Sequence, residues 1–369
     1  MISLFSPFIP PETGEEVKKT IDSGWINRGK KAQAFENKIS GMFSLPYCHA
    51  VNSGTSALKL ALDVAGIGRG DEVISTPWTM VATNTSILEN EAVPVFSDIE
   101  YDTLNIDPND IEDHITNKTK ALVCVHYAGY PCDMDEIIKI GREHDLPVIQ
   151  DAAQALGAQY KGKYIGSFGD FVCISFQTIK VITMGDGGLI VTNTKERYEE
   201  IKRKSWFGID KEKRISSPLG TYPEDITELG FKYDITDIDA ALGLVGLKHI
   251  EEALRKRKNI AERYFEELSS CRKIRLLDYR ENKSSSYWMF PIHVNKRLSF
   301  AKYMKDNDIE VSVHNWRNDK YSIFGGIQDD LPNTSKVNED IIHIPLHPNL
   351  TDEDVDYVIK KVKEWDSNT

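Results

Sequence analysis

Short apolar runs alternate with amphipathic stretches through the first half of the chain. The runs at residues 72–76, 93–96, 120–126, 146–151, 171–176 and 188–193 predict strands, and helical spacing of apolar residues predicts helices over 35–43, 55–65, 81–89 and 134–144. Strands that alternate with helices in this way indicate an α/β fold. We expect a mostly parallel sheet that is covered by helices on both faces.

The pattern changes after about residue 236. A long helical pattern runs from Ala240 through Leu247 towards Leu268, followed by strand candidates near 287–294, a helix near 300–307 and a closing helix over 352–365. We expect the change of domain inside the long helix. The prediction is a large domain over residues 1–245 and a small C-terminal α+β domain over residues 246–369.

The composition argues against several kinds of binding partner. The net charge of −12 argues against a nucleic-acid partner, because phosphate backbones require a concentrated basic face. No segment approaches the roughly 20 apolar residues that cross a bilayer, and the N-terminus does not resemble a signal peptide. The five cysteines lack the short spacing of zinc or redox motifs. We therefore expect a cytoplasmic protein with no membrane partner and no metal site.

Asp151 and Lys180 form the strongest chemical signal. Asp151 ends one apolar run, and Lys180 follows the next run along the chain. Open α/β sheets present side chains to ligands at the ends of their strands, so the two can lie side by side. A lysine that forms a Schiff base and a carboxylate that keeps a pyridine nitrogen protonated are what pyridoxal 5′-phosphate (PLP) requires. Either charge alone is more simply a loop residue, but together they predict a PLP site.

A second signal is the sequence Gly54-Thr55-Ser56, which opens a predicted helix directly after an apolar strand. Free backbone N–H groups at a helix start, together with hydroxyls, can cradle a phosphate. Serine and threonine are also ordinary N-caps, so this signal is weak by itself. The glycine-rich turn at Gly185–Gly188 is open to two interpretations, a phosphate cradle or a tight connection between strands.

Several motifs resemble those of a known family. They are Gly24-Trp-Ile-Asn-Arg-Gly, Asn52-Ser-Gly-Thr-Ser-Ala-Leu, Val125-His-Tyr-Ala-Gly, Asp151-Ala-Ala-Gln-Ala-Leu-Gly-Ala, Gly166-Ser-Phe-Gly-Asp, Ser175-Phe…Lys180…Gly185-Asp-Gly-Gly, Thr236-Asp-Ile-Asp-Ala-Ala and Ile344-Pro-Leu-His-Pro. Together they are similar to the nucleotide-sugar aminotransferases of the DegT/DnrJ/EryC1/StrS family over essentially the whole chain. The resemblance implies a fold type I PLP-dependent transferase of the aspartate aminotransferase superfamily, with a seven-stranded sheet in its large domain.

The resemblance also implies roles for individual residues. Lys180 matches the Schiff-base lysine, which also moves the proton between substrate and cofactor. Asp151 matches the partner of the pyridine nitrogen, and Gln154 matches the residue beside the cofactor's phenolic oxygen. The residues that correspond to the phosphate-binding turn and to the hydroxyl that completes it are Gly54, Thr55, Ser56 and Ser175.

Four positions depart from the family pattern. In the family the active site lies at a dimer interface, and a loop of the other subunit, often Gly-x-Asn-x-Arg, reaches the phosphate. This chain has Gly230-Phe-Lys-Tyr-Asp, so Lys232 is the expected phosphate contact and any contact of the usual arginine is in doubt. Met80 occupies the position of an aromatic residue that commonly stacks on the cofactor ring, where a methionine can also pack. Gln177 replaces a histidine near the substrate.

Three further residues are candidates for substrate contacts. His126 follows an apolar strand, where lining the pocket and a purely structural role are equally open. His314 and Arg317 lie in a segment similar to the family's C-terminal region that approaches the sugar nucleotide. Arginine is well suited to a pyrophosphate, whereas a solvated loop is the alternative interpretation.

The resemblance implies a transaminase that works in two half-reactions. L-glutamate would donate its amino group to PLP, and the group would then pass to a nucleotide-linked keto-deoxysugar, of which the 4-keto-6-deoxyhexoses are the commonest class. We expect a homodimer with shared active sites. The product would serve deoxysugar biosynthesis for a surface glycan, such as lipopolysaccharide O-antigen, or for a secondary metabolite.

Three alternative functions compete with this one. A PLP-dependent sugar dehydratase of the same family carries a histidine where this chain has Lys180. A non-catalytic sensor or binding protein would be favoured by loss of Lys180 or Asp151, and both are present. A dinucleotide-binding oxidoreductase would show Gly-x-Gly-x-x-Gly after its first strand, and this chain does not.

Overall fold

A seven-stranded sheet forms the centre of the computed structural model, which describes residues 1–222 and 225–368. The strand order is β1-β9-β8-β5-β4-β2-β3. The strands are β1 (Tyr47–Val51), β2 (Glu72–Ser75), β3 (Val93–Phe96), β4 (Thr119–Val125), β5 (Val148–Asp151), β8 (Phe171–Ser175) and β9 (Gly188–Thr192). Strands β8, β5, β4, β2 and β3 run parallel, and β9 is antiparallel to both neighbours. The prediction of a mostly parallel seven-stranded sheet is confirmed.

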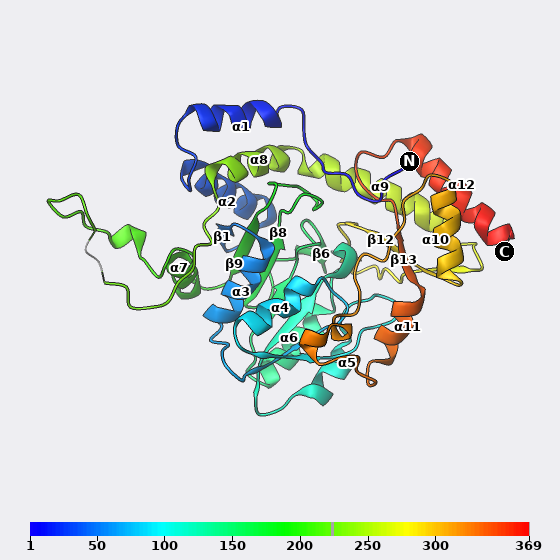
Figure 1. The fold of residues 1–369 in the computed structure, drawn as a ribbon, viewed down its shortest axis with the longest axis horizontal. Coiled ribbons are helices and arrows are strands. Elements are labelled where there is room, and N and C mark those ends of the chain that lie inside the picture. The colour runs from blue at the N-terminus through cyan, green and yellow to red at the C-terminus, as the bar shows by residue number, and fades with distance from the viewer. Residues whose placement is uncertain (223–224, 369) are drawn as a thin grey trace.

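Helices cover this sheet and form the outer layers of the molecule (Figure 1). The α-helices are α1 (Thr13–Asp22), α2 (Lys30–Phe43), α3 (Gly54–Val64), α4 (Val81–Glu89), α5 (Pro108–Ile111), α6 (Met134–Glu143), α7 (Lys195–Lys204), α8 (Asp237–Lys248), α9 (Ile250–Leu268), α10 (Arg297–Asp306), α11 (Pro332–Asp340) and α12 (Asp352–Asn368). Helices α1, α2 and α8 pack together beside β1, as Figure 1 shows.

Both faces of the sheet are buried, which explains its continuous apolar runs. In β8, Phe171 and Cys173 belong to the apolar cluster that includes α3, α4 and α7, whereas Val172 and Ile174 belong to the cluster that includes α2, α6 and α8. Successive side chains of a strand point to opposite faces, so a strand covered on both sides requires apolar residues at every position.

A smaller antiparallel sheet and its own apolar cluster make up the C-terminal part. The sheet has the order β10-β12-β13, with β10 (Ile274–Leu276), β12 (Phe290–Val294) and β13 (Ile341–Ile344), and packs with α9, α10 and α12. A third sheet, β11-β6-β7, joins β11 (Lys283–Ser284) to β6 (Gln159–Tyr160) and β7 (Lys163–Tyr164). The C-terminal part is therefore tied to the main sheet's connections by backbone pairing.

The long helix expected after residue 236 is divided into two helices. The backbone leaves helical geometry at His249 (φ −112°, ψ 5°), between α8 and α9. The proposed boundary between residues 245 and 246 falls inside α8 and stays a prediction. The first residues of the chain lie against the C-terminal part, because Ile2 forms a β-bridge with Ile309 and the Leu4 amide donates to Glu310.

One segment leaves the body of the molecule. It follows α7 and extends to one side in Figure 1. Its apolar residues Ile215, Leu219 and Leu229 are exposed by 81%, 88% and 80%. Among the described residues, no helix is both long and apolar enough to cross a membrane.

Candidate active site

Asp151 and Lys180 meet at one edge of the sheet. Asp151 is the last residue of β5, and Lys180 follows β8, the strand that pairs in parallel with β5. The loop that carries the lysine is closed by a hydrogen bond from the Lys180 amide to the Gln177 carbonyl (2.9 Å). The charge of Asp151 acts directly on the Lys180 amine, so the structure brings together the pair that the sequence singled out.

The Lys180 amine lies below the protein surface, although the residue as a whole is half-buried. Burial lowers its pKa to about 8, and the charge of Asp151 opposes that change. About one amine in ten is then neutral at pH 7, against fewer than about one in a thousand for an ordinary lysine. Among the described residues, no carboxylate forms an ion pair with this amine. It is therefore available as a base and as a nucleophile.

The Asp151 carboxylate is held on both of its oxygens. Thr83 donates its hydroxyl to Oδ2 (2.7 Å), and the Ala153 amide donates to Oδ1 (3.0 Å). Thr83 lies in the first turn of α4, where its hydroxyl also meets that of Thr79 at 3.0 Å. Sequence reasoning missed Thr83, because no pattern relates it to a residue 68 positions further along the chain.

A narrow cradle lies at the start of α3. Ser53 caps the helix by accepting from the Ser56 amide (3.0 Å), and the Ser56 hydroxyl donates to Asn52 (2.7 Å). A β-carbon on Gly54 would lie 2.8 Å from that of Ser175, and one on Gly188 would lie 2.2 Å from the Ser53 carbonyl oxygen. Only glycine fits at both positions. The helix start and the end of β8 thus come together, so the free N–H groups of the helix and the Ser175 hydroxyl lie at one place where a small anion could bind.

These residues fit PLP. The cradle offers backbone N–H groups and the hydroxyls of Thr55 and Ser175, Asp151 offers a fixed carboxylate, and Lys180 offers an amine with a lowered pKa. Phosphate, pyridine nitrogen and carbonyl each have a chemically matched group within one site.

Gln154 and His126 are both engaged with the backbone around a tight turn. Gln154 accepts from the Ala128 amide at 2.7 Å, and Ala128 has a left-handed backbone (φ 55°). His126 accepts from the Cys132 amide through Nδ1 (3.1 Å), so its Nε2–H donates to Gln150 (3.1 Å). Both ring nitrogens of His126 are used within the fold. A substrate contact for His126 stays a prediction.

The Trp288 ring lies over the Lys180 amine, and two further rings, Phe5 and His314, pack against Trp288. Of the three rings, the sequence indicated only His314. The amine nitrogen lies 3.8 Å from the centre of the Trp288 ring. Trp288 in turn packs against Phe5 (5.7 Å) and His314 (5.2 Å). Burial, His343 and Lys180 lower the pKa of His314 to about 3. His314 was a predicted substrate contact, and the structure places it beside the lysine. Phe5 and Trp288 carried no sequence signal, because each reaches the site from a distant part of the chain.

The remaining predicted residues lie around this centre or away from it. Met80 is 51% exposed at the start of α4, and Gln177 is exposed in the lysine loop. Arg317 is buried and donates twice to Asp319, from Nε (2.7 Å) and from Nη2 (2.5 Å), so its guanidinium is used within the fold. The exposed Lys232 places its amine 4.2 Å from the centre of the Trp206 ring. The ligand contacts expected of these four residues stay predictions.

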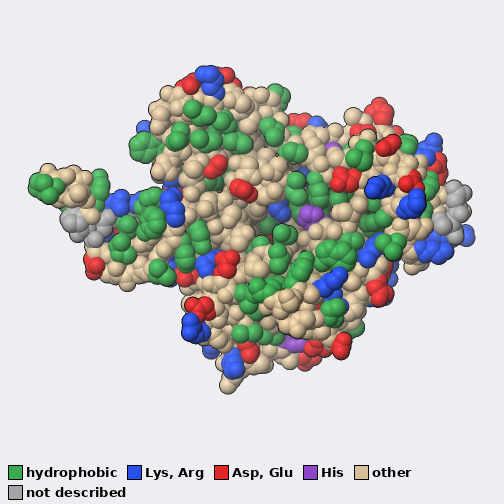
Figure 2. Space-filling model, viewed as in Figure 1, with side chains coloured by type: hydrophobic (Ala, Val, Ile, Leu, Met, Phe, Trp, Pro, Cys, Tyr) green, Lys and Arg blue, Asp and Glu red, His purple; other side chains and the backbone are tan. Residues whose placement is uncertain are grey.

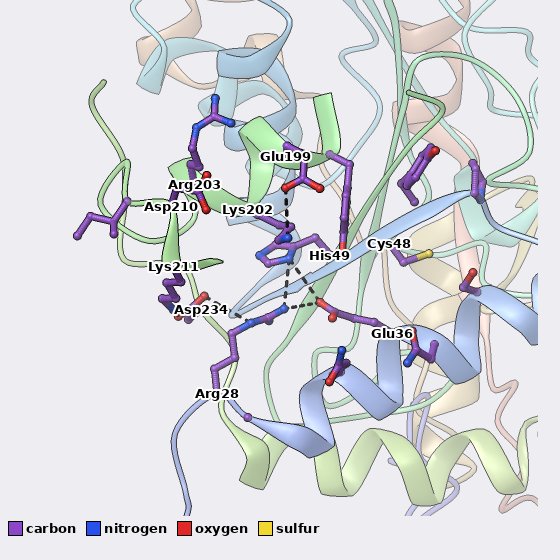
Figure 3. A pocket seen from close by; sticks show the side chains of 18 residues that line it. Arg28, Glu36, Cys48, His49, Glu199, Lys202, Arg203, Asp210, Lys211 and Asp234 are labelled. Atoms are coloured by element: carbon purple, nitrogen blue, oxygen red, sulfur yellow. Dashed lines mark hydrogen bonds and ion pairs between the residues drawn. The ribbon is translucent and has the colours of Figure 1, made fainter. Parts of the chain in front are cut away.

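A separate cleft of about 500 Å³ lies between α2, β1 and α7 (Figure 3). Its charged residues pair with one another. Arg28 contacts Glu36 at 2.7 Å and His49 at 3.2 Å, and Lys211 contacts Asp234 at 2.7 Å. Asp234, which replaces the usual family arginine, is thus a partner for cations. Neither Asp151 nor Lys180 lines this cleft.

Comparison with known proteins agrees with this arrangement. The DegT/DnrJ/EryC1/StrS aminotransferase family matches the chain over residues 8–363. The GDP-perosamine synthase of Escherichia coli O157:H7 is 33% identical over 100% of this chain and 99% of its own. The solved sugar aminotransferase CalS13 from Micromonospora echinospora has a TM-score of 0.94, with 30% identity over 99% of this chain and 100% of its own. The PLP form of the putative sugar aminotransferase Spr1654 from Streptococcus pneumoniae has a TM-score of 0.91, with 30% identity over 99% and 98% of the two chains. This chain belongs to the DegT/DnrJ/EryC1/StrS aminotransferase family and is a PLP-dependent sugar aminotransferase.

Proposed function

We propose that the enzyme transfers the amino group of L-glutamate to a nucleotide-linked keto-deoxysugar, with a 4-keto-6-deoxyhexose as the preferred class. The observation that carries the proposal is the buried Lys180 amine, which feels the charge of Asp151 and forms no ion pair among the described residues. Similarity to a GDP-perosamine synthase, whose name specifies a GDP-linked product, supports a nucleotide-bound substrate. The product would enter deoxysugar biosynthesis for a surface glycan such as O-antigen, and the reaction would take place in the cytoplasm.

Lys180 and Asp151 have different roles in the proposed reaction. Bound PLP supplies an electron sink for the carbon whose proton is removed. Lys180 bonds the cofactor between turnovers and, once released, moves the proton at the substrate carbon, for which its lowered pKa suits it. Asp151 holds a proton on the pyridine nitrogen, and Thr83 and the Ala153 amide fix the carboxylate for that role.

The other proposed contacts follow from their places around the centre. Gly54, Thr55, Ser56 and Ser175 would bind the phosphate at the start of α3. Gln154 would lie beside the phenolic oxygen and Met80 against the ring. For the sugar nucleotide, His314 has the best support because it lies next to Lys180. Gln177 and Arg317 are proposed by resemblance, and His126 is proposed from its position after an apolar strand.

A homodimer with shared sites would complete the phosphate contacts. Exposed apolar side chains gather over α1 and the segment after it, where Ile21, Trp25 and Ile26 are exposed by 53%, 63% and 49%. Others lie on the segment after α7 that extends from the body, and Figure 2 shows hydrophobic side chains in both places. A second copy that covers these surfaces would bring its own Lys232 to the phosphate. Lys232→Ala should then weaken PLP retention, and unaltered cofactor affinity would remove Lys232 from the site.

The test of the function is an absorption spectrum of the purified protein before and after addition of L-glutamate. We expect a visible band that shifts to the form typical of pyridoxamine phosphate. Each candidate keto-deoxysugar nucleotide is then added to the aminated enzyme, and the correct class restores the original band. A protein that takes up PLP but does not respond to L-glutamate would contradict the amino donor. One that takes up no PLP would contradict the function.

A further inference from the structure

The ring beside the reactive amine is fully buried and directly faces it. Trp288 has 0% of its surface exposed, and the Lys180 nitrogen lies 3.8 Å from its ring centre. The face of an indole ring attracts an ammonium group more strongly than that of any other aromatic side chain, and the attraction grows when water is excluded. The Lys180 amine therefore has a defined resting place in the absence of a bond to cofactor.

Trp288 is held by three hydrogen bonds. Its indole N–H donates to the carbonyl of Ile179, the residue before the lysine, at 2.8 Å. Its amide donates to the Ala128 carbonyl at 3.0 Å. Its own carbonyl accepts from the buried Arg257 of α9 at 3.0 Å. The ring is thereby fixed relative to the lysine loop, to the turn beside Gln154 and to the C-terminal part at once.

Among the described residues the Trp288 ring contacts the amine, whereas Asp151 attracts it by its charge without forming an ion pair. Two titratable groups act on Lys180, Asp151 from the end of β5 and His314 from the segment before Trp316. Thr83 and the Ala153 amide already occupy the Asp151 carboxylate. His314, whose pKa lies near 3, is uncharged at neutral pH and does not repel the ammonium.

We propose that Trp288 is a positioning residue whose indole face holds the Lys180 ammonium whenever the lysine is released, while its N–H fixes the loop that carries the lysine. The inference rests on the proposed role of Lys180. In the first half-reaction the lysine would leave the cofactor and move a proton, and in the second it would move a proton and bond the cofactor again. Between these two bonds it is a free amine. A fixed resting place keeps the amine within reach of the substrate carbon. It also keeps the amine away from Asp151, whose charge is needed by the pyridine nitrogen of the cofactor.

The loss of the Trp288 ring should change the pKa of Lys180 in a definite direction. An aromatic face stabilises the ammonium form, so loss of that face should lower the pKa of Lys180 below its value near 8. We expect a fall of about one unit, which is a tenfold change in the acid dissociation constant.

The experiment titrates the amine itself and does not depend on turnover. The full-length protein, freed of cofactor, is labelled with acetic anhydride across a pH series, and mass spectrometry quantifies acetylation at Lys180. Trp288→Leu removes the ring, Trp288→Phe keeps a weaker ring without the N–H, and tryptophans of increasing ring fluorination at position 288 keep shape and N–H while they weaken the ring face. Tyr357→Leu, which removes a surface lysine–aromatic contact on α12, is the matched control.

We expect the midpoint of Lys180 labelling to fall stepwise with fluorination, by about one unit in total, and to be unchanged in Tyr357→Leu. Trp288→Phe should fall by less than Trp288→Leu. A midpoint that does not move across the fluorinated series would overturn the inference, even if Trp288→Leu does not fold. The proposed function fails separately, in the absorption spectrum of the unaltered enzyme, so the two failures are distinguishable.

Discussion

Two clusters of charge in this enzyme are built in opposite ways. In the cleft of Figure 3, Arg28, Glu36, Lys211 and Asp234 meet as ion pairs, with both pairs at 2.7 Å. Beside β5 and β8, the Lys180 amine forms no ion pair among the described residues and rests on the Trp288 ring. The first arrangement stabilises a fixed geometry. The second keeps an amine reactive.

The pKa values follow this difference. In the cleft, burial raises the pKa of Glu36 although Arg28 opposes the change, and burial lowers the pKa of His49 well below its usual range. His49 is then a neutral ring that accepts from Arg28 through Nδ1 and donates to Ser205 at 2.8 Å. Its bonds leave no free base. Lys180 is buried too, but it forms no ion pair among the described residues. Its pKa therefore falls to about 8, and the neutral amine can take part in the reaction.

Removal of the Lys180 amine should have the largest effect on turnover. Lys180→Ala should reduce turnover by about a thousandfold or more, because it deletes both the bond to the cofactor and the proton carrier. The measurements are the steady-state rate and the visible spectrum. Lys204→Ala is the control, since the amine of that lysine of α7 is already paired with Asp63 at 2.5 Å. Near-normal turnover in Lys180→Ala would end the assignment.

Asp151→Asn should give the next largest effect. The neutral amide cannot hold a positive charge on the pyridine nitrogen, so the rate of the L-glutamate half-reaction should fall by about a hundredfold or more. The side chain keeps its size and can still accept from Thr83, so circular dichroism should show an intact fold. The role would be refuted by an unchanged rate in stopped-flow absorbance.

For the ion-paired cleft of Figure 3 we expect the opposite behaviour, a loss of stability without a loss of activity. Glu36→Gln leaves Arg28 beside a neutral amide, and the free energy of unfolding should fall by about 3 kcal/mol while turnover stays normal. Chemical denaturation followed by fluorescence measures the first quantity. A large loss of activity at unchanged stability would show that the cleft takes part in the reaction, and the contrast between the two clusters would disappear.

The smallest effect is a pH dependence of cofactor capture. Below the pKa of about 8 the Lys180 amine is mostly protonated, so the rate at which cofactor-free protein bonds PLP should rise about tenfold for each pH unit and level off above that value. Stopped-flow absorbance follows the reaction. A rate that continues to rise towards the ordinary lysine pKa would show that burial does not act on Lys180 as described.

Local sequence patterns predicted most of the sheet and singled out the Asp151–Lys180 pair that the structure brings together. Asp151 and Lys180 could be found because each follows a continuous apolar run, and such runs report strands buried on both faces. The Gly54 turn could be found because helix starts have a recognisable composition. The break at His249 was missed, because apolar spacing continues across it.

What the sequence by itself determined is the α/β order of elements, the family, and the carboxylate and lysine at two neighbouring strand ends. Only the tertiary structure decided the partners of those groups. Thr83 donates to Asp151, 68 positions along the chain, and Trp288 donates to the Ile179 carbonyl, 109 positions away. Arg317 donates to Asp319 within the fold. The physical reason is that periodicity reports which face of an element is buried, whereas hydrogen bonds and ring contacts between distant residues depend on how the elements pack.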